Sequence, residues 1–110
     1  MAETFKNALI SNVNNGSDAT LYTAPASTTS IILGVAIANK TATDSTALVK
    51  LTDTSTSVTT ELIPTVAIPA NTTLEVLAGQ KYIMEAGDVL KIRSGHASTI
   101  DVTIGVLEIS

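Results

Sequence analysis

Several residue types that support chemistry are absent or scarce in this chain. The 110 residues include no cysteine and no tryptophan, and His96 is the one histidine. The absence of cysteine excludes disulfides, thiolate catalysis and thiolate zinc sites, and it leaves the redox compartment undetermined. Six basic residues against ten acidic ones give a net charge of −4. Because affinity for nucleic acid depends mainly on cations that neutralise phosphates, we expect no nucleic-acid partner.

Long hydrophobic runs are also missing. The longest apolar stretch, Ile31 to Ala38, is eight residues, whereas a membrane-spanning helix needs about 20. The N-terminus, Met1 to Lys6, has neither a cationic region nor a continuous apolar one, so we expect no cleaved signal and no membrane segment. The sequence therefore predicts synthesis and folding in a cytoplasm.

Hydroxyl-bearing and aliphatic residues make up much of the chain. Only 15% of residues are charged, and the sequence contains 18 Thr and 10 Ser. Val, Ile and Thr favour pleated strands, and here they recur in short runs separated by turn residues. This spacing predicts a single-domain, all-β antiparallel β-sandwich or jelly-roll-like fold of eight to nine strands. We assign residues 1–18 to an N-terminal arm or edge strand and residues 19–110 to the sandwich.

Individual strands follow from the alternation of side chains. Ser30 to Asn39 is apolar on both faces, with large odd and mostly small even positions, which predicts a central strand covered on each side. In the last strand, Thr99 to Ile109, the alternation places Ile100, Val102, Ile104 and Val106 on one face and Leu107 and Ile109 on the other. Pro64 and Pro69 bracket a segment that we expect at a sheet edge, because proline cannot donate to a ladder. An alternative for Thr4 to Ile10 is a helix of one or two turns with Phe5, Leu9 and Ile10 inward. The predicted strands are Phe5 to Val13, Thr20 to Thr23, Ser30 to Asn39, Thr46 to Thr52, Val58 to Ile63, Thr72 to Leu77, Lys81 to Met84, Asp88 to Ser94 and Thr99 to Ile109.

The sequence contains few residues that could form a catalytic site. A Ser-His-Asp site could be built from His96 with Ser94 or Ser98 and Asp101, but no Gly-x-Ser-x-Gly elbow is present. A solvated turn is the better interpretation of this loop. We therefore predict no enzyme, and we assign no catalytic residue.

Ligand-binding patterns are equally weak. Glu85 and Asp88 flank a glycine turn and are the nearest metal candidates, yet turn carboxylates usually accept backbone N–H bonds. Phosphate-binding glycine loops are absent. A sugar-binding site would depend on Phe5, Tyr22 and Tyr82, the three aromatic residues. We assign no metal ligand and no cofactor, and we keep carbohydrate binding as a weaker alternative.

A structural role is the simplest use for such a domain. Thr and Ser offer hydrogen-bonding groups without the desolvation cost of charge, so a surface rich in them is easily buried against a partner. Ser30 to Asn39 and Thr99 to Ile109 are apolar on both faces, so they carry more apolar surface than the interior of a single sandwich buries. We therefore expect an oligomer that covers the excess.

Several segments, in this order along the chain, resemble small virion proteins of tailed bacteriophages. The resemblance covers nearly everything from Thr20 onward. It rests on Thr20 to Ala26 (TLYTAPA), the apolar strand ending at Asn39, Ile68 to Glu75 (IPANTTLE), Met84 to Ile92 (MEAGDVLKI) and Val106 to Ile109 (VLEI).

This resemblance implies a function and partners. Such proteins are capsid decoration (cement) proteins, often trimers, or head-tail connector, tail and baseplate components. We favour a decoration protein that binds and stabilises the capsid shell as an oligomer. Its partners would be the major capsid protein or other virion proteins, and its location would be the capsid surface after assembly in the host cytoplasm. Residues 1–18 would then form an arm that reaches a neighbour, or an ordinary edge strand.

Overall fold

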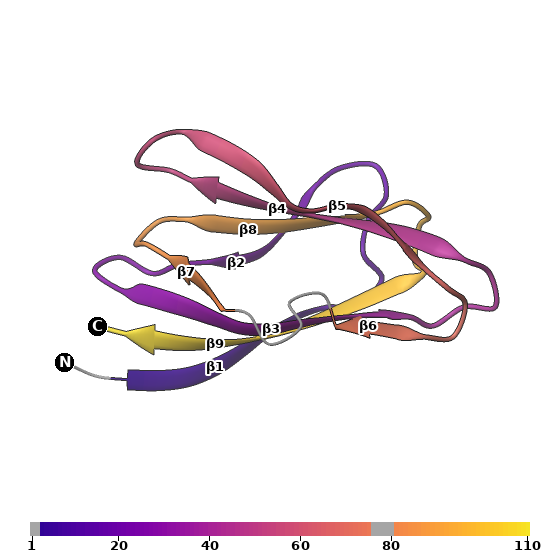
Figure 1. Cartoon of the computed structure of the whole chain (residues 1–110), viewed down its shortest axis with the longest axis horizontal. Coiled ribbons are helices and arrows are strands. Elements are labelled where there is room, and N and C mark those ends of the chain that lie inside the picture. The colour runs from indigo at the N-terminus through magenta and orange to yellow at the C-terminus, as the bar shows by residue number, and fades with distance from the viewer. Residues whose placement is uncertain (1–2, 76–80) are drawn as a thin grey trace.

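The computed structural model describes residues 3–75 and 81–110, which form nine strands in two stacked layers (Figure 1). This arrangement confirms the predicted all-β sandwich. The strands are β1 (Glu3–Ile10), β2 (Ala19–Thr23), β3 (Thr29–Asn39), β4 (Ser45–Asp53), β5 (Val58–Ile68), β6 (Thr73–Glu75), β7 (Tyr82–Met84), β8 (Val89–Ser94) and β9 (Ile100–Ile109).

Both sheets are antiparallel. Sheet A has the order β1-β9-β3-β6, with β7 also paired to β3. Sheet B has the order β2-β8-β4-β5. Glu3 on β1 is opposite Ile109 on β9, so the two ends of the described chain lie side by side (Figure 1).

The core lies between the two sheets and follows the period of two. On β9, Val102, Ile104 and Val106 are buried, whereas Leu107 and Ile109 lie on the other face, as the alternation predicted. Ile92 and Leu90 of β8 and Val49 of β4 face them from sheet B. Burial of side chains this size stabilises a fold by about 1.5–3 kcal/mol each.

A bulge in β3 changes the predicted face assignment. The register with β9 shifts between Ile32 and Gly34, so Leu33 is an extra residue. Ile32 and Val35 are both buried although their parity differs, and Leu33 is on the outer face with 36% of its surface exposed. The prediction that all odd positions share one face is therefore wrong, because a bulge inverts the alternation. β3 is central in sheet A, as predicted, but its outer face has no second layer among the described residues.

Three other predictions from the sequence concern the N-terminal segment, the proline-containing edge and the strand predicted from Thr72 to Leu77. Residues 3–10 form strand β1 and not a helix, and Phe5 and Leu9 point outward. The hydrogen bonds to β9 decide this, since the segment has few inward apolar residues to bury as a helix. β5 is an edge of sheet B, as Pro64 and Pro69 predicted, and its register with β4 shifts around Pro64. The last residues of the predicted strand Thr72 to Leu77 lie outside the described residues. Where the chain is described, no helix is long and apolar enough to cross a membrane.

Candidate functional site

The loop of His96 is a network of hydroxyl groups and backbone. Ser94 Oγ donates a hydrogen bond to the carbonyl oxygen of His96 at 2.6 Å, and it accepts one from the His96 amide at 3.2 Å. Thr99 Oγ1 donates to the same carbonyl at 2.8 Å. Ser94 is thus occupied with the backbone and is buried, while His96 is exposed. This is the geometry of a capped turn, in agreement with the solvated-turn interpretation.

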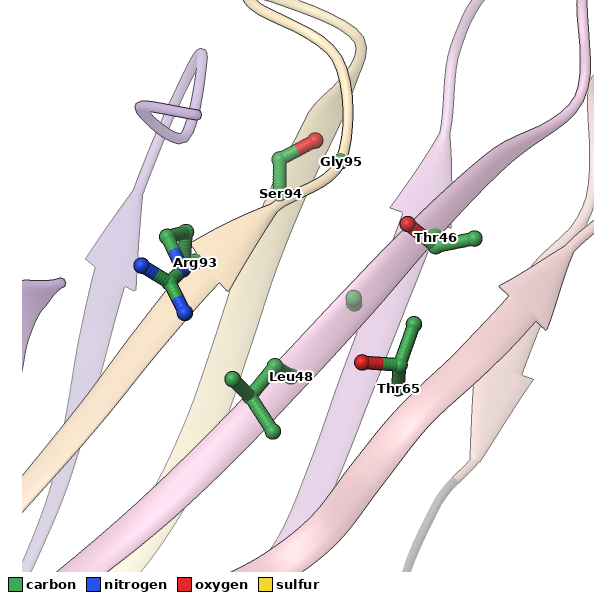
Figure 2. Close-up of a pocket in the computed structure, with 7 residues that line it drawn as sticks. Thr46, Leu48, Thr65, Arg93, Ser94 and Gly95 are labelled. Atoms are coloured by element: carbon green, nitrogen blue, oxygen red, sulfur yellow. The ribbon is translucent and has the colours of Figure 1, made fainter. Parts of the chain in front are cut away.

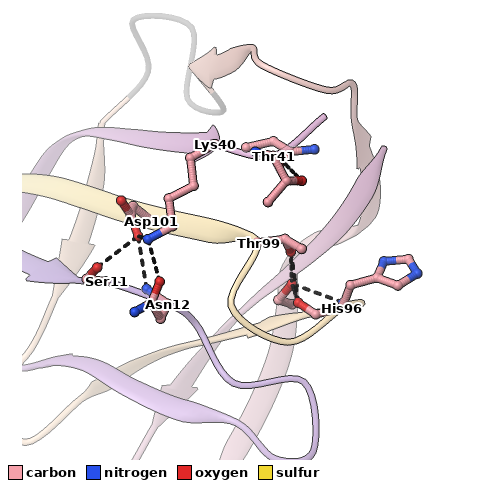
Figure 3. Close-up of polar contacts among 9 residues, drawn as sticks. Ser11, Asn12, Lys40, Thr41, His96, Thr99 and Asp101 are labelled. Atoms are coloured by element: carbon pink, nitrogen blue, oxygen red, sulfur yellow. Dashed lines mark hydrogen bonds and ion pairs between the residues drawn. The ribbon is translucent and has the colours of Figure 1, made fainter. Parts of the chain in front are cut away.

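Asp101 belongs to a different cluster. Its Oδ1 accepts hydrogen bonds from Ser11 Oγ at 3.1 Å and the Asn12 amide at 2.9 Å, and it pairs with Lys40 Nζ at 3.0 Å. The Asn12 amide, and then Lys40, lower the pKa of Asp101 below its ordinary value. Figure 3 shows the imidazole of His96 directed away from this cluster. Asp101 therefore anchors the segment after β1 and does not orient the histidine.

Three carboxylates lie together at the turn before β8. Oxygens of Asp53, Glu85 and Asp88 are within 4.8 Å of one another. Asp88 Oδ2 accepts the Glu85 amide at 2.9 Å and its Oδ1 accepts the Thr54 amide at 3.3 Å. Asp53 Oδ1 accepts Ser55 Oγ at 2.6 Å, and this bond is the main cause that lowers the pKa of Asp53. The carboxylates of Asp53 and Asp88 thus accept bonds from the two turns. For Asp88 this is the turn role that the sequence predicted as the alternative to a metal site.

The tyrosines considered for sugar binding pack against the core. Tyr22 Oη lies 2.8 Å from Ser30 Oγ and also donates to Glu108 Oε2. Burial and the bond to Glu108 raise the pKa of Tyr22 to about 12. Tyr82 is opposite the buried Ile32 and packs on the same core. Neither ring forms an open platform for a sugar.

A small pocket opens on the outer face of sheet B. Figure 2 shows Leu48 of β4, Thr65 of β5 and Arg93 of β8 around it. Its volume is about 70 Å³, whereas sites for organic ligands usually measure about 300–1,000 Å³. The pocket has room for water and not for an organic substrate.

The outer face of sheet A carries an apolar row that crosses four strands. Phe5 of β1 is opposite Leu107 of β9, Leu107 is opposite Ile31 of β3, and Ile31 is opposite Ile83 of β7. The ends of the row are the most open, since Phe5 is 75% exposed and Ile83 is 64% exposed. We call these four residues the apolar row.

A trough of about 400 Å³ lies beside the apolar row. Its floor is formed by Gly34 of β3 and Gly105 of β9, which are opposite each other. A Cβ atom on Gly105 would meet nothing within 4 Å, and one on Gly34 would meet only Glu75 Oε1 at 3.8 Å. Strand glycines weaken a sheet and often mark a place where another backbone approaches closely. Since packing within the chain does not require them, the trough is suited to an external partner.

Sequence reasoning missed this surface. Two glycines inside strand patterns were a usable signal, but only the register of β3 with β9 shows that Gly34 and Gly105 are neighbours. The outward direction of Phe5 and Leu9 was also missed, because the pairing of β1 with β9 decides which of its side chains lie on the outer face.

Comparisons with known proteins show similarity in fold. No family model and no curated protein matches the chain. A structure described as Bacillus endospore appendages that form a novel family of disulfide-linked pili matches with a TM-score of 0.56 and 12% identity, over 98% of this chain and 88% of that one. At that identity the match supports a shared fold alone.

Two viral structures match more weakly. A pentameric capsid protein from metagenomic phage sequences has a TM-score of 0.35 and 16% identity, over 94% of this chain and 59% of that one. The infectious bursal disease virus Gx strain structure has a TM-score of 0.33 and 12% identity, over 98% and 37% of the two chains. Scores of this size carry no argument about function.

Proposed function

We propose that this chain is a non-enzymatic structural protein of a phage virion, and specifically a decoration protein that binds the capsid shell as an oligomer. The observation that carries the proposal is the outer face of sheet A. There the glycine-floored trough lies beside the apolar row, and both are open to solvent. Exposed apolar surface framed by polar residues is typical of protein interaction sites.

The trough supports a protein partner because of its shape and its low charge. Gly34 and Gly105 allow a backbone or a large side chain of the partner to approach the sheet. Leu33 and Ala36 add apolar lining, and Glu75 is the charged residue that lines it. A segment of the major capsid protein with an apolar anchor and a basic neighbour would fit this surface. The sequence resemblance supplies the virion as the setting.

The polar clusters support a role without turnover. Ser94 is bonded to the backbone of its turn, and Asp101 is paired with Lys40. The exposed His96 has its Nδ1 at a long 3.4 Å from Ser45 Oγ, but Ser45 is buried and lies 2.9 Å from Thr99 Oγ1. A nucleophile needs a base within hydrogen-bond reach of its hydroxyl, and that base needs an orienting partner. The described clusters use these groups to hold turns instead.

Other structural roles give distinct outcomes. A head-tail connector, tail or baseplate protein would occupy few positions on the particle, whereas a decoration protein would cover the shell. A filament subunit is a second candidate, favoured by the match to the spore-appendage structure over 98% of this chain. With no cysteine in the chain, such a filament would be held by non-covalent contacts.

Binding to capsids tests the proposal. We expect the purified protein to bind shells that lack it in many copies and to raise their resistance to heat. Gly105→Val fills the trough, and its Cβ would meet nothing within 4 Å, so it should fold and bind at least about tenfold more weakly, as loss of close packing at an interface centre implies.

A matched control is Thr20→Val, which places the same side chain at an exposed strand position of sheet B. This variant should bind as the wild type does. Failure of the wild-type chain to bind shells, or binding confined to one vertex, would refute the decoration role. Equal binding by Gly105→Val and the wild type would exclude the trough as the contact.

A further inference from the structure

Strand β1 presents an unprotected edge of sheet A. On one side it pairs with β9 along all eight residues, and on the other side no strand pairs with it among the described residues. It contains no proline, and its charged residues are Glu3 and Lys6. Lys6 is engaged with Glu108 Oε1 at 3.1 Å. Proteins usually protect such edges with proline, charge, a bulge or a very short strand.

The other sheet edges have that protection. β5 contains Pro64 and a register shift, β2 has a register shift within its five residues, and β6 and β7 are three residues each. β1 is therefore the one edge, over residues 3–75 and 81–110, that is long, regular and without proline, and its one lysine is paired within the chain with Glu108. A free row of backbone donors and acceptors of this kind is a template for another strand.

We propose that two copies of this chain pair antiparallel through β1, so that sheet A continues across a twofold axis. The partner is a second copy because β1 is complementary to itself in one register. This inference goes beyond the proposed function, since self-pairing is independent of binding to a shell.

Symmetry limits the registers that are available. A twofold axis that joins two antiparallel edges must be perpendicular to the sheet, so both outer faces lie on the same side. Two residues that face each other across the axis then both have odd numbers or both have even numbers. One residue of β1 lies at the axis and faces the same residue of the second copy. With Phe5 or Ala8 on the axis, only residues 3–7 or 6–10 of the strand overlap.

Two registers use seven residues of β1. With Lys6 on the axis, residues 3–9 overlap, but two like charges face each other. With Asn7 on the axis, residues 4–10 overlap, and two polar amides meet instead. Phe5 then faces Leu9 of the second copy, and Lys6 faces Ala8 of the second copy. The Asn7 register is therefore the one that we assign.

This register covers exposed apolar surface. Phe5 and Leu9 are 75% and 62% exposed in the single chain, and both lie on the outer face. In the pair, each would pack against the other across the new strand junction. The apolar row of one copy would then continue from Phe5 to Leu9 of the next, which makes one strip on the shared outer face.

Cysteine cross-linking tests the register, because the chain has no cysteine of its own. Facing strand residues have Cα atoms about 4.5–5.5 Å apart, a separation that a disulfide spans. Asn7→Cys should therefore form a covalent dimer on mild oxidation, read on a non-reducing gel. Phe5→Cys alone should not, whereas the double variant Phe5→Cys with Leu9→Cys should. Cross-linking by Phe5→Cys alone, or none by Asn7→Cys above the level of the loop variant Ser17→Cys, would overturn the register.

Sedimentation tests the pairing itself. We expect the wild-type chain to form dimers at about 100 μM, the range of modest interfaces, and Phe5→Glu to weaken dimerisation at least tenfold. Ile83→Glu is the matched control, because Ile83 is another largely exposed apolar residue of the same face and lies away from β1. Circular dichroism checks that both variants fold.

The outcomes separate pairing from other associations. If Phe5→Glu and Ile83→Glu weakened dimerisation equally, the two copies would associate by stacking their outer faces. That result would overturn the proposal. A monomer, or the trimer that the family resemblance implies, would also overturn it, because this twofold contact closes only a dimer. Capsid binding is measured separately with Gly105→Val, so a failure of the shell role leaves the result on β1 intact.

Discussion

Tyr22 of sheet B donates a hydrogen bond from its Oη to Oε2 of Glu108 in sheet A, so these two side chains join the layers of the sandwich. Ser30 Oγ lies 2.8 Å from the same Oη, and Lys6 Nζ pairs with the other carboxylate oxygen at 3.1 Å. The cluster thus connects β1, β2, β3 and β9. Glu108 is only 8% exposed, and the bond from Tyr22 is the main cause that lowers its pKa.

Removal of the tyrosine hydroxyl should destabilise the fold. Tyr22→Phe leaves the ring in place but takes the neutral donor from a buried carboxylate, so we expect a loss of about 2 kcal/mol, the usual cost of a hydrogen bond to a charged group. Urea unfolding followed by circular dichroism measures the change. Thr20→Val is the matched control, because it removes an exposed hydroxyl from the same strand. A change below about 0.5 kcal/mol for Tyr22→Phe would show that the contact contributes little.

Stability should also fall in alkaline solution because of Tyr22. The pKa of Tyr22 is raised from 10.0 to about 12 in the folded chain, so the folded state keeps a proton that the unfolded state loses. The resulting stabilisation is complete below pH 10 and is lost as the pH rises from 10 to about 12. Unfolding curves across this range should show a steeper decline for the wild type than for Tyr22→Phe. Parallel declines would contradict the shift.

Two glycines should respond in opposite ways to alanine. A Cβ on Gly95 would lie 2.0 Å from Thr46 Oγ1 and 3.3 Å from Thr46 Cβ, whereas one on Gly105 would meet nothing. We expect Gly95→Ala to cost about 1–3 kcal/mol through overpacking and Gly105→Ala to stabilise by about 0.4–1 kcal/mol by restricting the unfolded chain. Thermal melts measure both. Adding Thr46→Ala should recover part of the loss in Gly95→Ala, and no recovery would point away from this clash.

The carboxylate cluster at Asp88 should matter for stability without any metal. Asp88 is 4% exposed and accepts the amides of Glu85 and Thr54, so Asp88→Ala should cost about 1–3 kcal/mol, the penalty for unsatisfied buried donors. We expect the melting midpoint of the wild type to be the same in EDTA and in millimolar calcium. A midpoint that rises with calcium and loses this response in Asp88→Ala would instead identify a cation site.

The predictability of the fold differs between elements. β9 was assigned correctly to the faces because its alternation is regular and β3 pairs with it without interruption from Val35 to Asn39. The β3 alternation failed at Leu33, since a bulge depends on the neighbouring strand and leaves no mark in an apolar run. The β5 edge was foreseen from Pro64, because a missing N–H is a local property.

Less of the candidate site than of the fold could be predicted from the sequence. The hydroxyl-rich turn at His96 and the turn role of Asp88 follow from local chemistry, and both were anticipated. The trough was not, because Gly34 and Gly105 are 71 positions apart and meet only through register. The direction of Phe5 likewise depends on its partner Leu107.

Composition and local pattern alone therefore determined the class of this protein: a β-rich chain without cysteine, with little charge and one histidine, whose strands and turns follow from short-range sterics. The tertiary structure alone decided which strand is left as a free edge and which small residues gather into a hollow. Strand pairing is non-local, and a shift of one residue moves every side chain to the opposite face. Surfaces made by several strands are for that reason set by register, which no single segment of the sequence encodes.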